Sequence, residues 1–138
     1  MKLIGFYQEM DPGYRESWGG PAPRPDSGAG TYPVGDVVGY LKSGYSILDV
    51  MESTVDVIGG SFRVPGGSSV LTDGCFVWRV DLSSYVGRYR IDLPREFLET
   101  IHGYGYRIPQ VTHEALLGIS VGVSRVLGFG AGSPAGPA

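Results

Sequence analysis

The sequence predicts an α+β fold, with a mostly antiparallel, twisted sheet of about four to six strands and two or three helices on one face. Three features of residues 69–103 support this fold class. Asp73-Gly74 separates two apolar runs, which indicates a β-hairpin. Apolar residues then recur at helical spacing over residues 82–89 and again over residues 94–103, which indicates two helices after the hairpin.

The first half of the chain predicts one strand, one long loop, one helix and a second strand. Residues 2–7 alternate loosely between polar and apolar side chains and predict the first strand. Residues 11–33 are rich in Gly, Pro and Ser and predict a long, flexible loop. Valines and a leucine at helical spacing predict a helix over residues 34–43, and residues 45–50 predict the next strand.

Two short β-prone runs precede the hairpin. Residues 54–58 and 61–64 are separated by two glycines, and the first run is also compatible with a helical turn that continues from Asp49. For the hairpin itself we expect a two-residue type I′ turn at Asp73-Gly74, because Asp tolerates positive φ and Gly adopts it freely. A longer loop around these two residues is the alternative.

The two helices after the hairpin have recognisable ends. Asp81 is expected to cap the helix over residues 82–89, with its carboxylate accepting hydrogen bonds from the free amides of the first turn. The second helix is expected to begin near Pro94, which has no amide to leave unbonded, and to end at Gly103.

The C-terminal part predicts one more helix and then a tail. Thr112 is expected to cap a short helix that ends at Leu117. Glycines among the valines after it weaken both helix and strand. We therefore expect a single globular domain over residues 1–120, containing the flexible loop 11–33. A Gly-rich tail is expected over residues 121–138, disordered at its end.

A set of residues between positions 38 and 101 forms one pattern: Leu71-Thr72-Asp73-Gly74, Trp78, Asp81-Leu82, Tyr85-Val86, Tyr89, Leu93-Pro94 and Phe97. This pattern resembles a family of small, mostly actinobacterial proteins. Some members look like the immunity proteins encoded beside bacterial toxins. The resemblance implies a common fold, and it carries over no catalytic residue.

Composition narrows the possible functions. The 138 residues carry a net charge of −3, and the 11 basic residues are scattered, so nucleic acid is not an expected partner. The single cysteine excludes an internal disulfide and a cysteine-based zinc site, in keeping with a reducing cytoplasm. The apolar stretch at the N-terminus is too short for a signal peptide, and no apolar run in the sequence is long enough to cross a membrane. A cytoplasmic protein without membrane contact is expected, and the resemblance implies that it is bacterial.

The residues usable for catalysis are few. Cys75 is expected to act as a small, buried or half-buried hydrophobe, and His102 to stabilise the end of its helix. His113 and Glu114 are adjacent, so on a helix their side chains diverge instead of sharing a metal ion. No nucleophile motif of the Gly-x-Ser-x-Gly type occurs in the sequence. No catalytic residue, metal site or cofactor is predicted.

Two functions from different classes are therefore compared. The first is a non-catalytic protein-interaction module, in its narrower form an immunity-type inhibitor of a toxin, with aromatic and acidic contacts. Its candidate contact residues are Trp18, Asp49, Glu52, Asp56, Tyr104 and Tyr106. The second is a small enzyme or small-molecule-binding protein with an aromatic pocket between the sheet and the helices. Its candidate pocket residues are Phe76, Trp78, Tyr85 and Tyr89.

Overall fold

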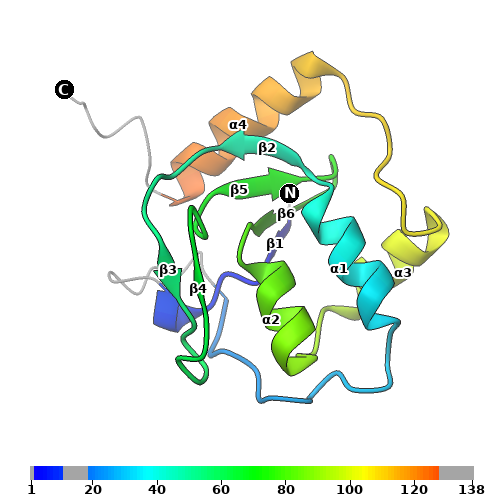
Figure 1. Ribbon diagram of the computed structural model, residues 1–138. Coiled ribbons are helices and arrows are strands. Elements are labelled where there is room, and N and C mark those ends of the chain that lie inside the picture. The colour runs from blue at the N-terminus through cyan, green and yellow to red at the C-terminus, as the bar shows by residue number, and fades with distance from the viewer. Residues whose placement is uncertain (1, 11–18, 128–138) are drawn as a thin grey trace.

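The computed structural model describes residues 2–10 and 19–127, and these residues form an α+β fold (Figure 1). The main sheet has four strands in the order β1-β6-β5-β2. Their bounds are Lys2–Ile4 for β1, Phe76–Arg79 for β6, Val70–Thr72 for β5 and Tyr45–Leu48 for β2. The fold class is confirmed. The main sheet has four strands, the low end of the predicted range of about four to six, because the other two strands form a separate pair.

The main sheet is mixed and not purely antiparallel. The pairs β5–β6 and β2–β5 are antiparallel, whereas β1 runs parallel to β6 at the edge. More than sixty residues separate β1 from its partner, so no local turn dictates its direction. The separate two-stranded sheet pairs β3, Thr54–Val55, with β4, Arg63–Val64. The first β-prone run, residues 54–58, therefore begins with a strand and not with a helical turn that continues from Asp49.

The hairpin between β5 and β6 has a longer loop than a two-residue turn. A type I′ turn needs positive φ at both central residues, and only Gly74 has it, at 98°. Asp73 instead accepts hydrogen bonds at Oδ1 from the N–H groups of Cys75 and Phe76, at 2.9 and 2.8 Å. The type I′ prediction is wrong, and the longer-loop alternative is confirmed, because the Asp73 side chain organises the turn.

Three helices cover one face of the main sheet (Figure 1). They are α1 at Val34–Lys42, α2 at Leu82–Tyr89 and α3 at Arg95–Gly103, which matches the expected spacing and ends. With the sheet they enclose the main core. Its largest fully buried side chains include those of Trp78, Tyr40, Tyr85, Phe97, Ile4 and Leu41.

The described part of the predicted flexible loop is bonded to the α2–α3 connection. The Gly28 N–H donates to the carbonyl oxygen of Arg90 at 2.8 Å, and the Tyr32 hydroxyl donates to that of Ile91 at 2.6 Å. A Cβ on Gly28 would lie 2.4 Å from the Ile91 oxygen, so this close approach requires glycine. Residues 19–33 therefore lie along the body of the protein, although they contain no helix or strand.

The fourth helix, α4, spans His113–Leu127 and lies on the opposite face of the sheet (Figure 1). Val123 and Leu127 pack there in a second cluster with Val70 and Val77. The prediction that the last helix stops at Leu117 is wrong, and residues 121–127, expected in the tail, belong to α4. Burial against the sheet offsets the unfavourable effect of the helix's glycines. In the described part of the chain, none of the helices has the length and hydrophobicity needed to cross a membrane.

Replacing Val123 by alanine tests whether the second cluster stabilises the fold. Val123→Ala is expected to lower the free energy of unfolding by about 2 kcal/mol, because it removes buried methyl groups and leaves a cavity. Val121→Ala in the same helix makes the same chemical change at an exposed position and should stay within about 0.5 kcal/mol of the parent. Urea unfolding of both variants measures the difference. Equal unfolding midpoints would contradict the packing of this turn on the sheet.

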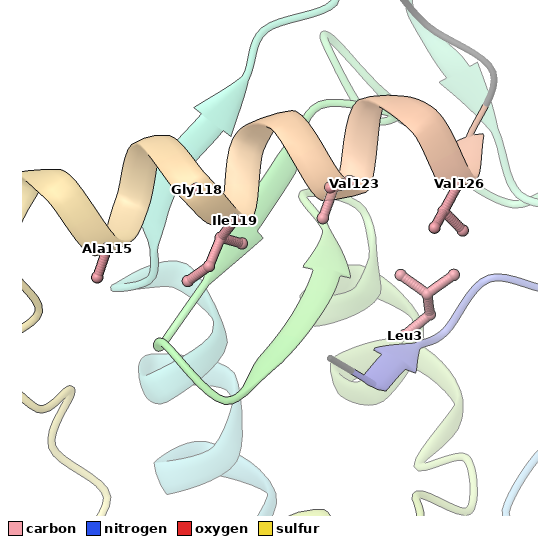
Figure 2. A pocket seen from close by; sticks show the side chains of 7 residues that line it. Leu3, Ala115, Gly118, Ile119, Val123 and Val126 are labelled. Atoms are coloured by element: carbon pink, nitrogen blue, oxygen red, sulfur yellow. The ribbon is translucent and has the colours of Figure 1, made fainter.

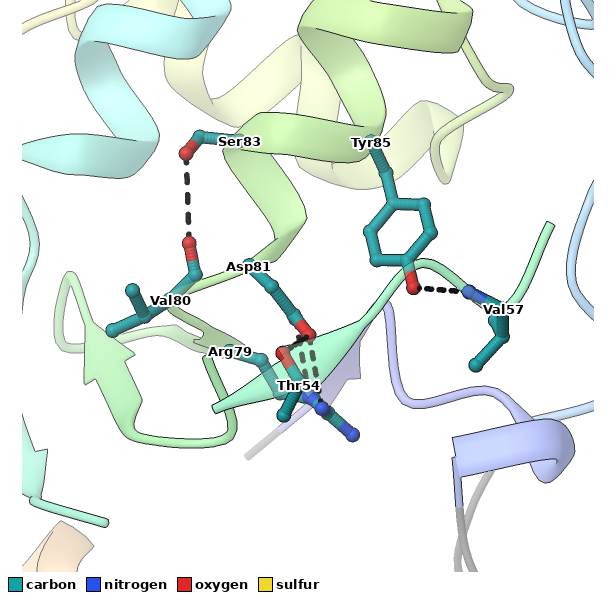
Figure 3. A network of polar contacts seen from close by, with 7 residues as sticks. All are labelled: Thr54, Val57, Arg79, Val80, Asp81, Ser83 and Tyr85. Carbon is teal, nitrogen blue, oxygen red and sulfur yellow. Dashed lines mark hydrogen bonds and ion pairs between the residues drawn. The ribbon is translucent and has the colours of Figure 1, made fainter. Parts of the chain in front are cut away.

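Asp81 precedes α2 as expected, but it does not cap the helix through its side chain. Its backbone is already helical, at φ −75° and ψ −8°, whereas a capping residue is typically extended. Its carboxylate instead accepts hydrogen bonds from Arg79 Nε at 3.1 Å, Arg79 Nη2 at 2.9 Å and Thr54 Oγ1 at 2.9 Å (Figure 3). The capping prediction is corrected: this carboxylate ties β3 to the junction of β6 and α2.

Candidate functional site

The four aromatic residues of the predicted pocket lie in the main core. Trp78 and Tyr85 are fully buried, and Phe76 and Tyr89 are nearly so. The Trp78 Nε1–H donates to the carbonyl oxygen of Leu41 at 2.9 Å. Figure 3 shows the Tyr85 hydroxyl, which accepts from the Val57 N–H at 2.9 Å. Both polar ends are thus used inside the protein. These side chains hold the sheet to its helices, and a ligand would have to displace them.

Of the three acidic candidates, Asp49 and Glu52 are exposed, whereas Asp56 is only 4% exposed. The Asp56 carboxylate accepts hydrogen bonds from the N–H groups of Ile58, Gly59 and Ser61 and from the hydroxyl groups of Ser61 and Tyr89. Burial favours its neutral form, but these donors outweigh burial and hold the pKa of Asp56 at about 2. Asp56 therefore organises the β3–β4 connection from inside.

The low pKa of Asp56 predicts how stability depends on pH. The group titrates near 3.8 when unperturbed and at about 2 in the folded protein, so the folded state binds its proton less tightly. The low pKa of Asp56 thus adds its full contribution to the free energy of unfolding above about pH 5. About 2 kcal/mol of this free energy is lost as the pH falls from 5 towards 2. Chemical unfolding across this range should show the stability difference between parent and Asp56→Asn shrinking on acidification. Asp49→Asn, at an exposed site, is the control; a constant difference for Asp56→Asn would contradict the assignment.

The aromatic contact candidates follow α3. Tyr104 is exposed, and its hydroxyl lies 3.9 Å from the Sγ of Cys75. Tyr106 is half-buried, and its ring packs edge-on against His102 with 5.9 Å between centroids. Cys75 is exposed in the hairpin loop, so the expectation of a buried or half-buried thiol is wrong. The loop geometry set by Asp73 turns it away from the sheet.

The structure does not bring all the predicted contact residues together. Asp49 and Glu52 lie between β2 and β3, and Tyr104 and Tyr106 lie directly after α3. Figure 1 places these two segments on opposite sides of the molecule. Trp18 lies outside the described residues. A single aromatic and acidic contact surface built from these candidates is therefore not supported by their positions.

A polar cleft of about 500 Å³ lies beside α3. Tyr32, Arg95, Glu99, His102 and Tyr106 are among its lining residues. Arg95 Nε pairs with Glu99 Oε2 at 3.3 Å, and both side chains are largely exposed. Among residues 2–10 and 19–127, no three His, Cys, Asp or Glu side chains are grouped so that they could hold a metal ion. Arg95, Glu99 and His102 are exposed in this cleft. Tyr32 is buried, and burial raises the pKa of its hydroxyl to about 12, so this group stays protonated near neutral pH.

The most unusual surface is the outward side of α4, which the sequence interpretation missed. Leu117 and Val121 are each 55% exposed, although both are large and apolar. Gly118 and Gly122 lie next to them, and a Cβ at either glycine would meet no heavy atom within 4 Å. The inward side carries the buried Val123 and Leu127. We call the side formed by Glu114, Leu117, Gly118, Val121, Gly122 and Arg125 the outer face of α4.

An apolar groove of about 450 Å³ adjoins the outer face. Its lining residues are Leu3, Ala115, Gly118, Ile119, Gly122, Val123 and Val126. Figure 2 shows Leu3 pointing from β1 towards α4, where Ile119, Val123 and Val126 project from the helix. The groove exists because α4 contacts β2 and leaves the β1 edge partly uncovered. Apolar surface therefore continues from the helix onto the sheet edge.

One sequence signal could have revealed this surface. Residues 115–124 contain no charged residue. A helix that is apolar all round is normally covered on every side, yet α4 has the sheet on only one side. The glycines at 118 and 122 concealed the signal, because they argued against a helix in this stretch. Only the helical conformation shows that Leu117 and Val121 point away from Val123.

No protein-family model matches the chain, and neither a curated protein nor a solved structure matches it. The resemblance to small actinobacterial proteins therefore stays a prediction. No residue role can be taken from a relative. The outer face of α4 is the candidate site on the strength of its exposure, its apolar character and its position on the fold.

Proposed function

We propose that this protein is a non-catalytic protein-interaction module whose contact surface is the outer face of α4. The observation that carries the proposal is the exposure of Leu117 and Val121 on a helix without a charged residue from 115 to 124. Contiguous apolar surface of this kind commonly marks an interaction site. Its removal from water is favourable by roughly 25 cal/mol per Å² of apolar surface.

The arrangement of the core supports a binding role over an enzymatic one. Trp78 and Tyr85, which an aromatic pocket would need, have their polar atoms bonded to the backbones of Leu41 and Val57. In the cleft beside α3, Glu99 and His102 are exposed, and the buried Tyr32 donates its hydroxyl hydrogen to the carbonyl oxygen of Ile91. Catalysis generally needs groups whose protonation is tuned by burial or by a close partner. The enzyme alternative therefore has less structural support than the interaction module.

The narrower hypothesis, an immunity-type inhibitor of a toxin, rests on the family resemblance and stays a prediction. Exposed acidic residues such as Asp49 and Glu52 would steer a basic partner and contribute more to the association rate than to the affinity. The measurement that tests this form is the activity of a toxin encoded by a neighbouring gene, with and without this protein. An unchanged toxin activity would contradict it.

The interaction proposal is tested by placing charges on the outer face. In the full chain, Leu117→Lys/Val121→Lys should abolish any self-association or co-purification with a defined partner, because it puts two ammonium groups into the interface. Met51→Lys is the matched control, since Met51 is 93% exposed and lies in the β2–β3 connection, outside the outer face of α4. Unchanged melting temperatures would show that both variants fold. The proposal fails if the parent protein neither self-associates nor binds a defined partner, or if the double variant still does so.

A further inference from the structure

We infer that the outer face of α4 binds a second copy of this chain, with the two α4 helices packed antiparallel across a two-fold axis. This inference rests on the proposed function and names its partner. It depends on the self-complementary order of side chains along the outer face: an acid at one end, a basic residue at the other and large and small apolar residues between them. An isologous interface requires a self-complementary surface, because the same patch must match itself.

The members of the outer face lie on one side of the helix. At 100° per residue, the six positions from Glu114 to Arg125 fall within an arc of about 140°. The arc is centred opposite Val123, which is buried against the sheet. Leu117 and Val121 lie on one flank of the arc, and Gly118 and Gly122 lie on the other. Glu114 and Arg125 lie near its middle, three turns apart.

Antiparallel packing about an axis between Ile119 and Ser120 aligns these features. It brings Glu114 level with Arg125 of the second copy, and the two-fold axis repeats this pair at the other end. It also places Leu117 and Val121 of the second copy on the same flank. Their offset along the helix axis is about one residue's rise, 1.5 Å. The exposed apolar side chains thus cover one another.

The glycines suit this arrangement and have no evident role within a single copy. Gly118 and Gly122 have open space where a Cβ would lie, so alanine would fit at either position. Alanine is also the better helix former. On the flank opposite Leu117 they leave room for a second backbone to come close. A small-residue stripe alone would not identify an occupant, but the charges at the two ends do.

Charge decides the orientation. Glu114 and Arg125 are both exposed, and neither makes an ion pair with any residue in the ranges 2–10 and 19–127. A parallel pair would place Glu114 beside Glu114 and Arg125 beside Arg125, which is unfavourable. In the antiparallel pair each Glu114 lies beside Arg125 of the other copy, so two ion pairs form across the interface. A partner of unrelated sequence would have no reason to match this order.

The size of the contact sets the expected strength. A helix of 15 residues is about 22 Å long, so a single helix pair buries less than the roughly 1,200–2,000 Å² of stable complexes. We therefore expect a reversible dimer with a dissociation constant on the order of 10–100 µM. At much lower concentrations the chain should be monomeric.

Sedimentation velocity of the full chain, over concentrations that bracket this range, tests the inference. Leu117→Lys/Val121→Lys should be monomeric throughout, and Met51→Lys should dimerise as the parent does. Glu114→Arg alone and Arg125→Glu alone should each weaken dimerisation about tenfold, because each creates two like-charged contacts. The combined variant Glu114→Arg/Arg125→Glu should return to within about threefold of the parent. Thermal melts confirm that each variant is folded.

The rescue by the combined variant is specific to an antiparallel second copy. Additive weakening without rescue would overturn the inference, as would a parent chain that is monomeric at all these concentrations. A monomeric parent that binds a different protein through Leu117 and Val121 would overturn only the second-copy inference and leave the proposed function standing. A parent that does neither would overturn both.

Discussion

Trp78→Ala is expected to lower the free energy of unfolding by about 3–5 kcal/mol. Trp78 is 0% exposed and lies in the central strand β6, and its ring packs against those of Tyr40 and Phe97 at centroid distances of 5.9 and 5.8 Å. Its removal leaves a large cavity and also leaves the Leu41 carbonyl without its indole donor. Because a domain of this size is typically stable by only about 5–15 kcal/mol, the variant should be close to unfolding.

Urea unfolding followed by circular dichroism measures this loss. Met51→Ala is the control, because truncation of an exposed side chain should change stability by less than about 0.5 kcal/mol. Trp78→Phe keeps most of the apolar volume but loses the hydrogen bond, and it should fall between the two. A Trp78→Ala variant as stable as the parent would show that the core around β6 is packed differently.

Arg79→Ala should destabilise the fold by about 3–5 kcal/mol, because it leaves the Asp81 carboxylate buried without its charged partner. Both side chains are almost fully buried, and the guanidinium bonds both carboxylate oxygens. Burial raises the pKa of Asp81, and Arg79 and Thr54 oppose this shift. Without Arg79 the carboxylate loses most of the interactions that lower its pKa. The folded state must then bury an unpaired charge or take up a proton.

A matched pair of controls separates burial from charge. Arg95→Ala breaks an exposed ion pair with Glu99 on α3 and should cost less than about 0.5 kcal/mol. Arg79→Met/Asp81→Leu removes both buried charges and should recover much of the stability lost by Arg79→Ala. Equal losses for Arg79→Ala and Arg95→Ala in urea unfolding would contradict the buried pair. So would a double variant that is no more stable than Arg79→Ala.

The elements that were predicted well are those whose signals act over a few residues. The helices α1, α2 and α3 follow from apolar residues at helical spacing and from nearby turn or proline residues. The β5–β6 hairpin follows from Asp73-Gly74, although its loop is longer than a type I′ turn. In each case the residues that decide the structure are close neighbours in the chain.

The candidate site was not predicted, because its defining property is exposure. Leu117 and Val121 have the composition of core residues, and only the docking of Val123 and Leu127 on the sheet leaves them outside. Asp56 and Asp81 show the converse. Both look like surface carboxylates in the sequence, and both are buried by contacts with distant residues, Tyr89 and Thr54 among them.

The sequence by itself determined the α+β class, the three helices of the main core and the β5–β6 hairpin, because spacing, turn chemistry and helix ends are local properties. Only the tertiary structure decided that β1 enters parallel to β6, that α4 continues to Leu127 and that its outer face stays uncovered. These features depend on which distant surfaces meet, and the free energy of burial that selects them is shared among residues far apart in the chain.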